Sequence, residues 1–245
     1  MYPVICRIGP LTIYSYGLML AVAAVICSLL MSRDARRLKI PSEMVFDFYF
    51  WVVLAGILGA RIFYVILNWE DYFQYNPGAI VMIQSGGLAW QGGLGMAMLV
   101  GIFFVWLKKQ SILTWMDMSA PYIALGQAIG RLGCFLNGCC YGRLVSWGIY
   151  FPVHGERLHP TQLYSAAALF LIFIMLKIFR RHSRIPGHVF AWYMMLAAVE
   201  RFVVEFFRAD HFTLYAGFSI FQIVTLGIFS CGIILYRVFQ YLARR

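Results

Sequence analysis

Seven apolar stretches of similar length constrain this chain more than any other feature. Each is close to the roughly twenty residues that an α-helix needs to cross the hydrocarbon core of a bilayer. They cover residues 11–31, 44–67, 90–107, 116–136, 160–179, 189–207 and 218–239. Only 12% of the 245 residues are charged, against about 25% in soluble domains. The sequence therefore predicts an all-α, polytopic membrane protein in which residues 1–245 form a single domain with no separate soluble part.

The basic residues are unevenly distributed over the connecting segments. Thirteen of the 20 Lys and Arg residues fall in segments 33–39, 108–109, 177–184 and 237–245, whereas only Arg7, Arg143, Arg157 and Arg208 fall in the alternate connections. Cytoplasmic loops carry an excess of Lys and Arg. The pattern predicts about seven spans, with the N-terminus outside and the C-terminus in the cytoplasm. Topology also explains the net charge of +10, so no nucleic-acid partner is predicted.

Ionisable side chains inside the apolar stretches indicate a functional site. An arginine at the centre of a span costs about 2.5–3.5 kcal/mol, so such residues usually face an interior cavity. Arg131 and Arg201 lie at similar depth, near the outer ends of the fourth and sixth stretches. Glu205 and Arg208 follow Arg201 at i+4 and i+7, which places the three on one helical face. Interhelical salt bridges with Glu200 or Glu205 are the purely structural alternative.

Glycines accompany these arginines. Gly126, Gly130 and Gly133 clear one side of the fourth stretch, and Gly92 and Gly93 clear the third. Small residues let helices pack closely, or they leave space for a phosphate-bearing lipid headgroup beside the arginines. Guanidinium groups bind phosphate bidentately. The residues therefore predict an anion site for a phospholipid at the outer surface.

Three of the six cysteines are clustered, namely Cys134, Cys139 and Cys140. They form no C-x-x-C pair, and no nearby run of histidines completes a zinc ligand set. No metal and no cofactor are predicted. Small buried packing residues are the favoured interpretation, and a disulfide facing an oxidising exterior is the alternative.

The stretch "GRLGCFLNGCCYGR" at residues 130–143 resembles the signature of the prolipoprotein diacylglyceryl transferase family. Other segments resemble motifs of that family in the same order along the whole chain, so the match is specific. These segments are "RIGPLTIYSYGLM" (7–19), "GARIFYV" (59–65), "GGLAWQGGLGM" (86–96), "LHPTQLYSA" (158–166), "ERFVVEFFR" (200–208) and, more weakly, "FSIFQ" (218–222).

The resemblance implies transfer of the diacylglyceryl group of phosphatidylglycerol to the lipobox cysteine thiol of a preprolipoprotein signal peptide. A thioether forms and glycerol phosphate leaves. The reaction would occur at the outer leaflet of the bacterial cytoplasmic membrane. Arg131 and Arg201 would stabilise the departing phosphate, and Glu205 would orient an arginine or the headgroup. Further substrate contacts are implied for Tyr16, Gln91, Gly92, Gly93, Asn137 and Arg208.

Three positions depart from the family pattern. Gln91, Cys134 and Cys139 stand where the family usually has His, Asn and Glu. A glutamine cannot accept a proton at neutral pH, so Gln91 is not the general base. The remaining candidates are Glu205, Glu200, His154 and His159, or the substrate thiol ionises without a base.

Two functions from other classes compete with this interpretation. A membrane thiol oxidoreductase would use Cys134, Cys139 and Cys140, but the missing C-x-x-C pairs argue against it. A small-solute transporter would use Glu200 and Glu205 as ion sites. Transporter folds often contain internal repeats, and the sequence shows none.

Overall fold

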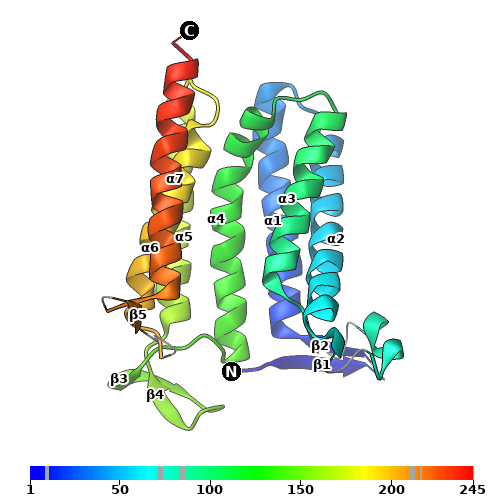
Figure 1. The fold of residues 1–245 in the computed structure, drawn as a ribbon, viewed down its shortest axis with the longest axis vertical. Coiled ribbons are helices and arrows are strands. Elements are labelled where there is room, and N and C mark those ends of the chain that lie inside the picture. The colour runs from blue at the N-terminus through cyan, green and yellow to red at the C-terminus, as the bar shows by residue number, and fades with distance from the viewer. Residues whose placement is uncertain (9–10, 71–73, 83–85, 210–212, 216, 245) are drawn as a thin grey trace. The chain divides into compact units, whose positions relative to one another are not determined.

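The computed structural model describes residues 1–8, 11–70, 74–82, 86–209, 213–215 and 217–244. Long α-helices cover all seven predicted apolar stretches (Figure 1). They are α1 (Ser15–Ala35), α2 (Ser42–Leu67), α3 (Trp90–Leu107), α4 (Ile112–Asn137), α5 (Thr161–His182), α6 (His188–Glu205) and α7 (Ile220–Leu242). Among the described residues, the helical segments at α1, α2, α3, α5 and α7 are long and apolar enough to cross a membrane. The chain is therefore a helical, multi-pass membrane protein.

The chain is mostly helical, as predicted, and short β-hairpins connect or precede some of the helices. Strands β1 (Val4–Ile8) and β2 (Leu11–Tyr14) precede α1, β3 (Leu144–Phe151) and β4 (Glu156–Leu158) connect α4 to α5, and β5 (Thr213–Tyr215) and β6 (Phe218–Ser219) connect α6 to α7. Each pair is antiparallel. Strands β2 and β6 occupy the starts of the first and last apolar stretches, because apolar composition does not distinguish a short strand from the start of a helix.

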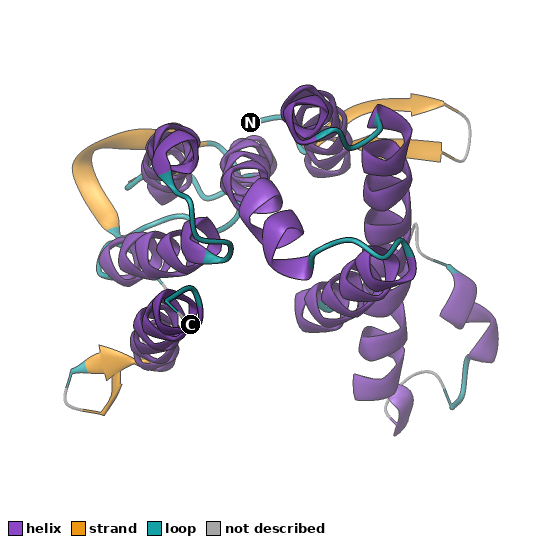
Figure 2. Ribbon diagram, turned by 90° about the horizontal axis from the view of Figure 1, so that it is seen from above, coloured by secondary structure: helices purple, strands orange, loops and turns teal. Residues whose placement is uncertain are grey.

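The described chain forms two compact units. Unit 1 contains Met1–Leu30 and Leu113–Arg245, and unit 2 contains Met31–Ile112. In unit 1, α6 packs between α5 and α7 (Figure 2). Ala120, Ala124 and Ala128 repeat every four residues along α4 and form a buried core with Leu169, Ile172 and Leu176 of α5 and Val189 of α6. All three hairpins lie at the same end of this unit (Figure 1).

Glycines on α4 face α1. A Cβ atom at Gly126 would contact Cys27, one at Gly130 would contact Leu20, and one at Gly133 would crowd Tyr16. The predicted glycine-lined side of this helix is thus occupied by α1. Close helix packing, the alternative interpretation, is what these residues provide.

Unit 2 is built on the tight pairing of α2 with α3. A Cβ atom at Gly92 would collide with the Gly59 carbonyl and with Phe63, and one at Gly93 would crowd the Gly56 carbonyl. The glycines of α3 therefore also serve helix packing, because backbone can approach backbone only where side chains are missing.

Arg61 of α2 is buried in unit 2 and donates hydrogen bonds from all three guanidinium nitrogens. Nε binds the Ile80 carbonyl at 2.9 Å, and Nη1 binds the carbonyls of Gly86 and Gly87 at 2.7 and 3.0 Å. Nη2 binds the carbonyls of Ala79 and Met82. Most of these carbonyls belong to, or flank, the 3₁₀ helix η3 (Pro77–Val81). Arg61 thus connects the segment before α3 to α2 through hydrogen bonds.

Candidate active site

Glu205 is the centre of a polar cluster at the hairpin end of unit 1. Its side chain is only 1% exposed, and Oε2 lies 2.9 Å from Arg201 Nη2 and 3.7 Å from Arg208 Nε. The i, i+4 and i+7 spacing therefore places the three side chains together, as predicted. Oε2 is close to both guanidinium groups, but it is not well aligned for a hydrogen bond with either of them. The carboxylate is shared between two cations.

The second oxygen of Glu205 binds the start of α7. Oε1 accepts a hydrogen bond from Ser219 Oγ at 3.1 Å. Ser219 is the N-cap of α7 and forms a capping box with Gln222, which satisfies free backbone N–H groups at the start of that helix. Both side chains are buried. Sequence analysis missed Ser219 and Gln222, although a Ser followed three residues later by Gln is a recognisable capping signal.

Arg201 has spare hydrogen-bonding capacity. Its side chain is 21% exposed, and the guanidinium carbon lies 5.2 Å from the centre of the Phe221 ring. Nη2 faces Glu205, whereas Nη1 is buried and has no hydrogen-bond partner among the described residues. A buried N–H group without an acceptor is costly. The arrangement is what a site for an additional anionic ligand requires.

Arg131 lies in the last turns of α4 and is partly buried. It is within electrostatic range of Arg201 and of Glu200. Among the described residues, no carboxylate oxygen lies within 4.0 Å of its guanidinium. Glu200 instead accepts a hydrogen bond from Ser165 of α5. The Arg201–Glu205 pair lies within α6 and is not an interhelical salt bridge of the kind considered from the sequence. Among the described residues, Arg131 forms no such bridge with Glu200 or Glu205.

Backbone contacts attach the loop after α4 to the end of α6. Gly142 pairs with Arg208, and the Arg143 N–H donates to the Phe207 carbonyl at 2.9 Å. A Cβ atom at Gly142 would collide with that same carbonyl. Glycine at position 142 therefore brings the "GRLGCFLNGCCYG" segment next to the Arg201–Glu205–Arg208 face.

Tyr16 and Asn137 lie on the border of this cluster. Tyr16, in the first turn of α1, is 41% exposed and packs against Gly133. It is within electrostatic range of Arg131. Asn137 is the last residue of α4, and its side chain is next to the Cys139 thiol. Their predicted hydrogen bonds to the substrate stay a prediction.

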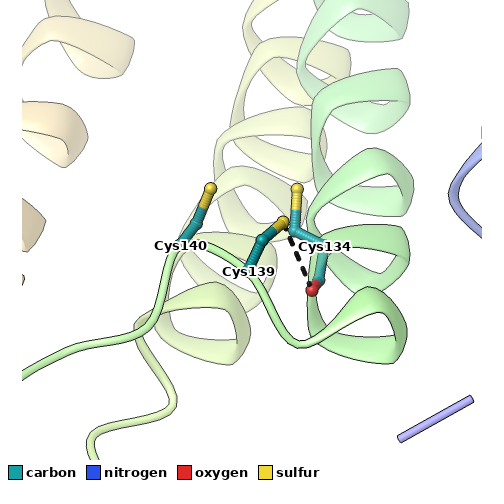
Figure 3. Close-up of side chains that lie close together, drawn as sticks. All are labelled: Cys134, Cys139 and Cys140. Carbon is teal, nitrogen blue, oxygen red and sulfur yellow. Dashed lines mark hydrogen bonds between the residues drawn. The ribbon is translucent and has the colours of Figure 1, made fainter. Parts of the chain in front are cut away.

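Cys134, Cys139 and Cys140 carry free thiols whose sulfur atoms all lie within 4.8 Å of one another (Figure 3). Cys134 is in the last turn of α4, and the other two follow in the loop. Hydrogen bonds from the thiols of Cys134 and Cys139, together with the nearby charges of Arg208 and Arg131, lower the pKa of Cys140. The loop after α4 thus concentrates three sulfur atoms within electrostatic range of two cations.

Two side chains of the "HPTQ" segment, at the start of α5, bind the loop that follows α4. Thr161 Oγ1 donates to the Cys140 carbonyl at 2.7 Å, and Gln162 Nε2 donates to the Cys139 carbonyl at 2.6 Å. Pro160 is the N-cap of α5, and α5 has no side-chain cap hydrogen bond. The side chains instead hold the backbone of the loop that carries the cysteines.

Two histidines that sequence analysis considered as bases have structural partners. His154 Nε2 lies 3.0 Å from the Gly138 carbonyl, and its ring packs at 4.1 Å from that of Tyr141. His159 Nδ1 lies 3.1 Å from the Tyr164 hydroxyl, and its ring packs against Trp147. These contacts stabilise the β3–β4 region. They do not place either imidazole in contact with Arg131, Arg201 or Glu205.

Gln91, Gly92 and Gly93 belong to unit 2, in the first turn of α3. Gln91 is exposed, and Gly92 and Gly93 pack against α2. Their predicted substrate contacts stay a prediction.

The chain is a multi-pass helical membrane protein with a buried, partly unsatisfied arginine cluster at the hairpin end of unit 1. The sequence model of the prolipoprotein diacylglyceryl transferase family matches residues 3–238. The chain belongs to this family of membrane transferases.

Individual relatives agree with the family match. A phosphatidylglycerol–prolipoprotein diacylglyceryl transferase of Finegoldia magna is 34% identical, over 90% of this chain and 88% of the relative. A protein of the same name from Listeria monocytogenes is 35% identical, over 96% of this chain and 89% of the relative. One from Bacillus cereus is also 35% identical, over 93% of this chain and 88% of the relative. A thiol oxidoreductase and a solute transporter are not favoured by these relatives.

Proposed function

We propose that this protein transfers the diacylglyceryl group of phosphatidylglycerol to the lipobox cysteine of preprolipoprotein signal peptides, the first step of lipoprotein maturation. The observation that carries the proposal is the buried Nη1 of Arg201, which has no partner among the described residues, in a family named for this transfer. A phosphate oxygen of the lipid would satisfy this group.

The charges of the cluster fit a phosphate. Arg131 and Arg208 both lie within electrostatic range of Arg201, with Glu205 and Glu200 as the acidic partners. One positive charge is thus in excess when both carboxylates are ionised. A phosphodiester would neutralise it, and guanidinium groups match its geometry bidentately.

The chemical step needs charge stabilisation more than a protein nucleophile. The substrate sulfur attacks the primary carbon that carries the phosphate ester, the C–O bond breaks, and the phosphate oxygen leaves with the bonding electrons. Donors positioned where this charge develops accelerate such a step. Arg131 and Arg201 would bind the departing phosphate, and Glu205 would orient both Arg201 and Arg208. Tyr16 and Asn137 would contact the glycerol headgroup. Gln91, Gly92 and Gly93 would also contact substrate.

The proposal includes a topology. All seven helices would cross the membrane within one membrane domain, including α4 and α6, which are less apolar because they carry Asp117, Arg131, Glu200 and Arg201. The hairpin end of unit 1 would face the outer leaflet, with the N-terminus outside and the C-terminus in the cytoplasm. The concentration of basic residues in the alternate connections supports this orientation.

Transfer is tested directly with the purified chain in detergent, phosphatidylglycerol and a lipobox peptide. Mass spectrometry of the peptide should show a diacylglyceryl thioether on its cysteine and on no other residue. A lipobox peptide with serine in place of the cysteine is the matched control. Unmodified peptide under conditions in which a characterised relative is active would refute the proposal.

Topology is tested with reporters. A reporter fused after Arg245 should be cytoplasmic, and one inserted at Gly155, between β3 and β4, should be external. Both reporters on the same side would contradict the orientation.

A further inference from the structure

The cysteine cluster depends on an unusual backbone conformation. Gly138 and Cys140 have φ angles of +78° and +62°, and such values are uncommon for residues other than glycine, asparagine or aspartate. Between them, the Cys139 N–H donates to the Cys134 carbonyl at 3.2 Å. The two left-handed residues return the chain toward α4, so that the three thiols converge (Figure 3). A left-handed cysteine costs free energy and persists only where surrounding structure holds it.

The surrounding structure holds it from α5. Thr161 and Gln162, each 1% exposed, donate to the carbonyls of Cys140 and Cys139. The sulfur positions are thus fixed by hydrogen bonds to the backbone and do not depend on a bond between the sulfurs, which are free thiols. A rigid arrangement of three unbonded sulfurs is a preformed ligand set.

We propose that Cys134, Cys139 and Cys140 bind a zinc ion through their three thiolates. Zinc–sulfur bonds of about 2.3 Å in tetrahedral geometry place the sulfurs about 3.8 Å apart. The cluster, with all sulfurs within 4.8 Å of one another, therefore needs a contraction of about 1 Å or less. Three thiolates around Zn²⁺ leave one negative charge, which would lie within electrostatic range of Arg131 and Arg208.

The zinc would have one open position, because the described residues supply three ligands and zinc prefers four. Resting on the proposed function, we assign this position to the lipobox cysteine. Arg131 lies three residues before Cys134 on the same face of α4, so a sulfur bound there is next to the phosphate site. A thiol that coordinates zinc is deprotonated, whereas a free thiol has a pKa of about 8.5. Zinc would thereby replace the general base that Gln91 cannot provide.

The step balances without an oxidant. The substrate thiol gives its proton to water when it binds zinc. The sulfur electron pair then forms the C–S bond to the glyceryl carbon, and the C–O bond breaks toward the phosphate, whose charge Arg131 and Arg201 take up. The thioether is a weaker ligand than a thiolate and leaves. The zinc remains Zn²⁺ throughout.

Metal binding is tested on the full chain in detergent, stripped of metal under reducing conditions and titrated with Co²⁺ as a spectroscopic probe for zinc. One equivalent should produce a sulfur-to-cobalt charge-transfer band that Zn²⁺ abolishes. Cys134→Ser and Cys139→Ser should each lose most of the band. Cys6→Ser and Cys231→Ser, at exposed cysteines outside the cluster, are the matched controls and should keep it. Absence of the band in the unsubstituted protein, or a disulfide among the three cysteines, would overturn the proposal.

Transfer by the stripped protein then separates the two proposals. A general base contributes about a hundred-fold or more, so we expect stripping to reduce transfer by at least that factor and Zn²⁺ to restore it. Full transfer without metal would overturn the zinc proposal and leave the proposed function intact. If the protein binds zinc but transfers nothing under any condition, the role assigned to the open position is wrong. With phosphatidylglycerol and the peptide both present, that result would also refute the proposed function.

Discussion

Arg61 and Arg201 are both arginines inside apolar helices, yet the structure uses them in opposite ways. Arg61, in unit 2, donates to five backbone carbonyls from all three of its nitrogens. Arg201, in unit 1, shares a carboxylate with Arg208 and keeps a buried Nη1 with no partner among the described residues. An intramembrane arginine therefore indicates a ligand site only after its donors have been counted. Arg61 stabilises the fold, and Arg201 keeps a donor that we propose binds the substrate.

Replacing Arg61 should have the largest effect. Arg61→Met leaves several buried carbonyls without donors, at a cost of about 1–3 kcal/mol for each unsatisfied group. We expect the variant to accumulate poorly and to lose its folded form on mild heating. Protease resistance and thermal aggregation in detergent measure this loss. Arg37→Met, at an exposed position before α2, is the control. Normal stability of Arg61→Met would show that the hydrogen bonds of Arg61 do not stabilise the fold.

Conservative changes at the phosphate site should damage transfer and spare the fold. Lysine keeps the charge of Arg131 or Arg201 but lacks the bidentate fork. Loss of one positioned donor at a developing charge costs about a hundred- to a thousand-fold in rate. Peptide lipidation by Arg131→Lys and Arg201→Lys at matched membrane expression tests this expectation. The exposed Arg143→Lys should transfer normally, and near-normal rates in both site variants would leave these arginines a structural role only.

Neutralising Glu205 should have an intermediate effect. Glu205→Gln removes the ionic partner of Arg201 and Arg208 but keeps an acceptor for Ser219. A hydrogen bond to a charged group contributes about 1.5–3 kcal/mol, so transfer should fall by about ten- to a hundred-fold. Ser219→Ala separates the two contacts, because it removes the neutral hydrogen bond and keeps the ion pairs. A greater loss in Ser219→Ala than in Glu205→Gln would show that the capping box, and not the ionic pairing, is what matters.

The smallest effect is expected at Gln91. Gln91→His restores the residue that the family usually has, in unit 2. Since zinc would already ionise the substrate thiol, transfer with metal should change by less than about three-fold. In the metal-stripped protein the same substitution should raise transfer, because a base is then missing. Equal rates of the two proteins without metal would mean that His at position 91 does not act as a base in this chain.

Much of the site was predictable from the sequence. The i, i+4 and i+7 spacing of Arg201, Glu205 and Arg208 fixes a shared helical face regardless of the rest of the fold, and the ion pairs confirm it. The glycines were harder to interpret. Gly92, Gly93 and Gly133 equally suit a lipid cavity or a close helix contact, and only the positions of Gly59 and Tyr16 show that they pack against neighbouring helices.

The sequence alone determined the membrane class, the helix ranges to within a few residues and the family. The length of each apolar stretch and the order of the motifs can be read from the sequence without knowing which segments contact one another. The tertiary structure decided which polar groups are satisfied. Asp117 accepts hydrogen bonds from the backbone N–H groups of Gly187 and Phe190, some seventy residues away, and Arg61 reaches the carbonyls before α3. The three cysteines converge only because residues 138 and 140 are left-handed and α5 holds their loop. The spacing of the cysteines in the sequence does not predict this change of chain direction. Its conformational free energy is compensated by hydrogen bonds from α5, which is distant in the sequence.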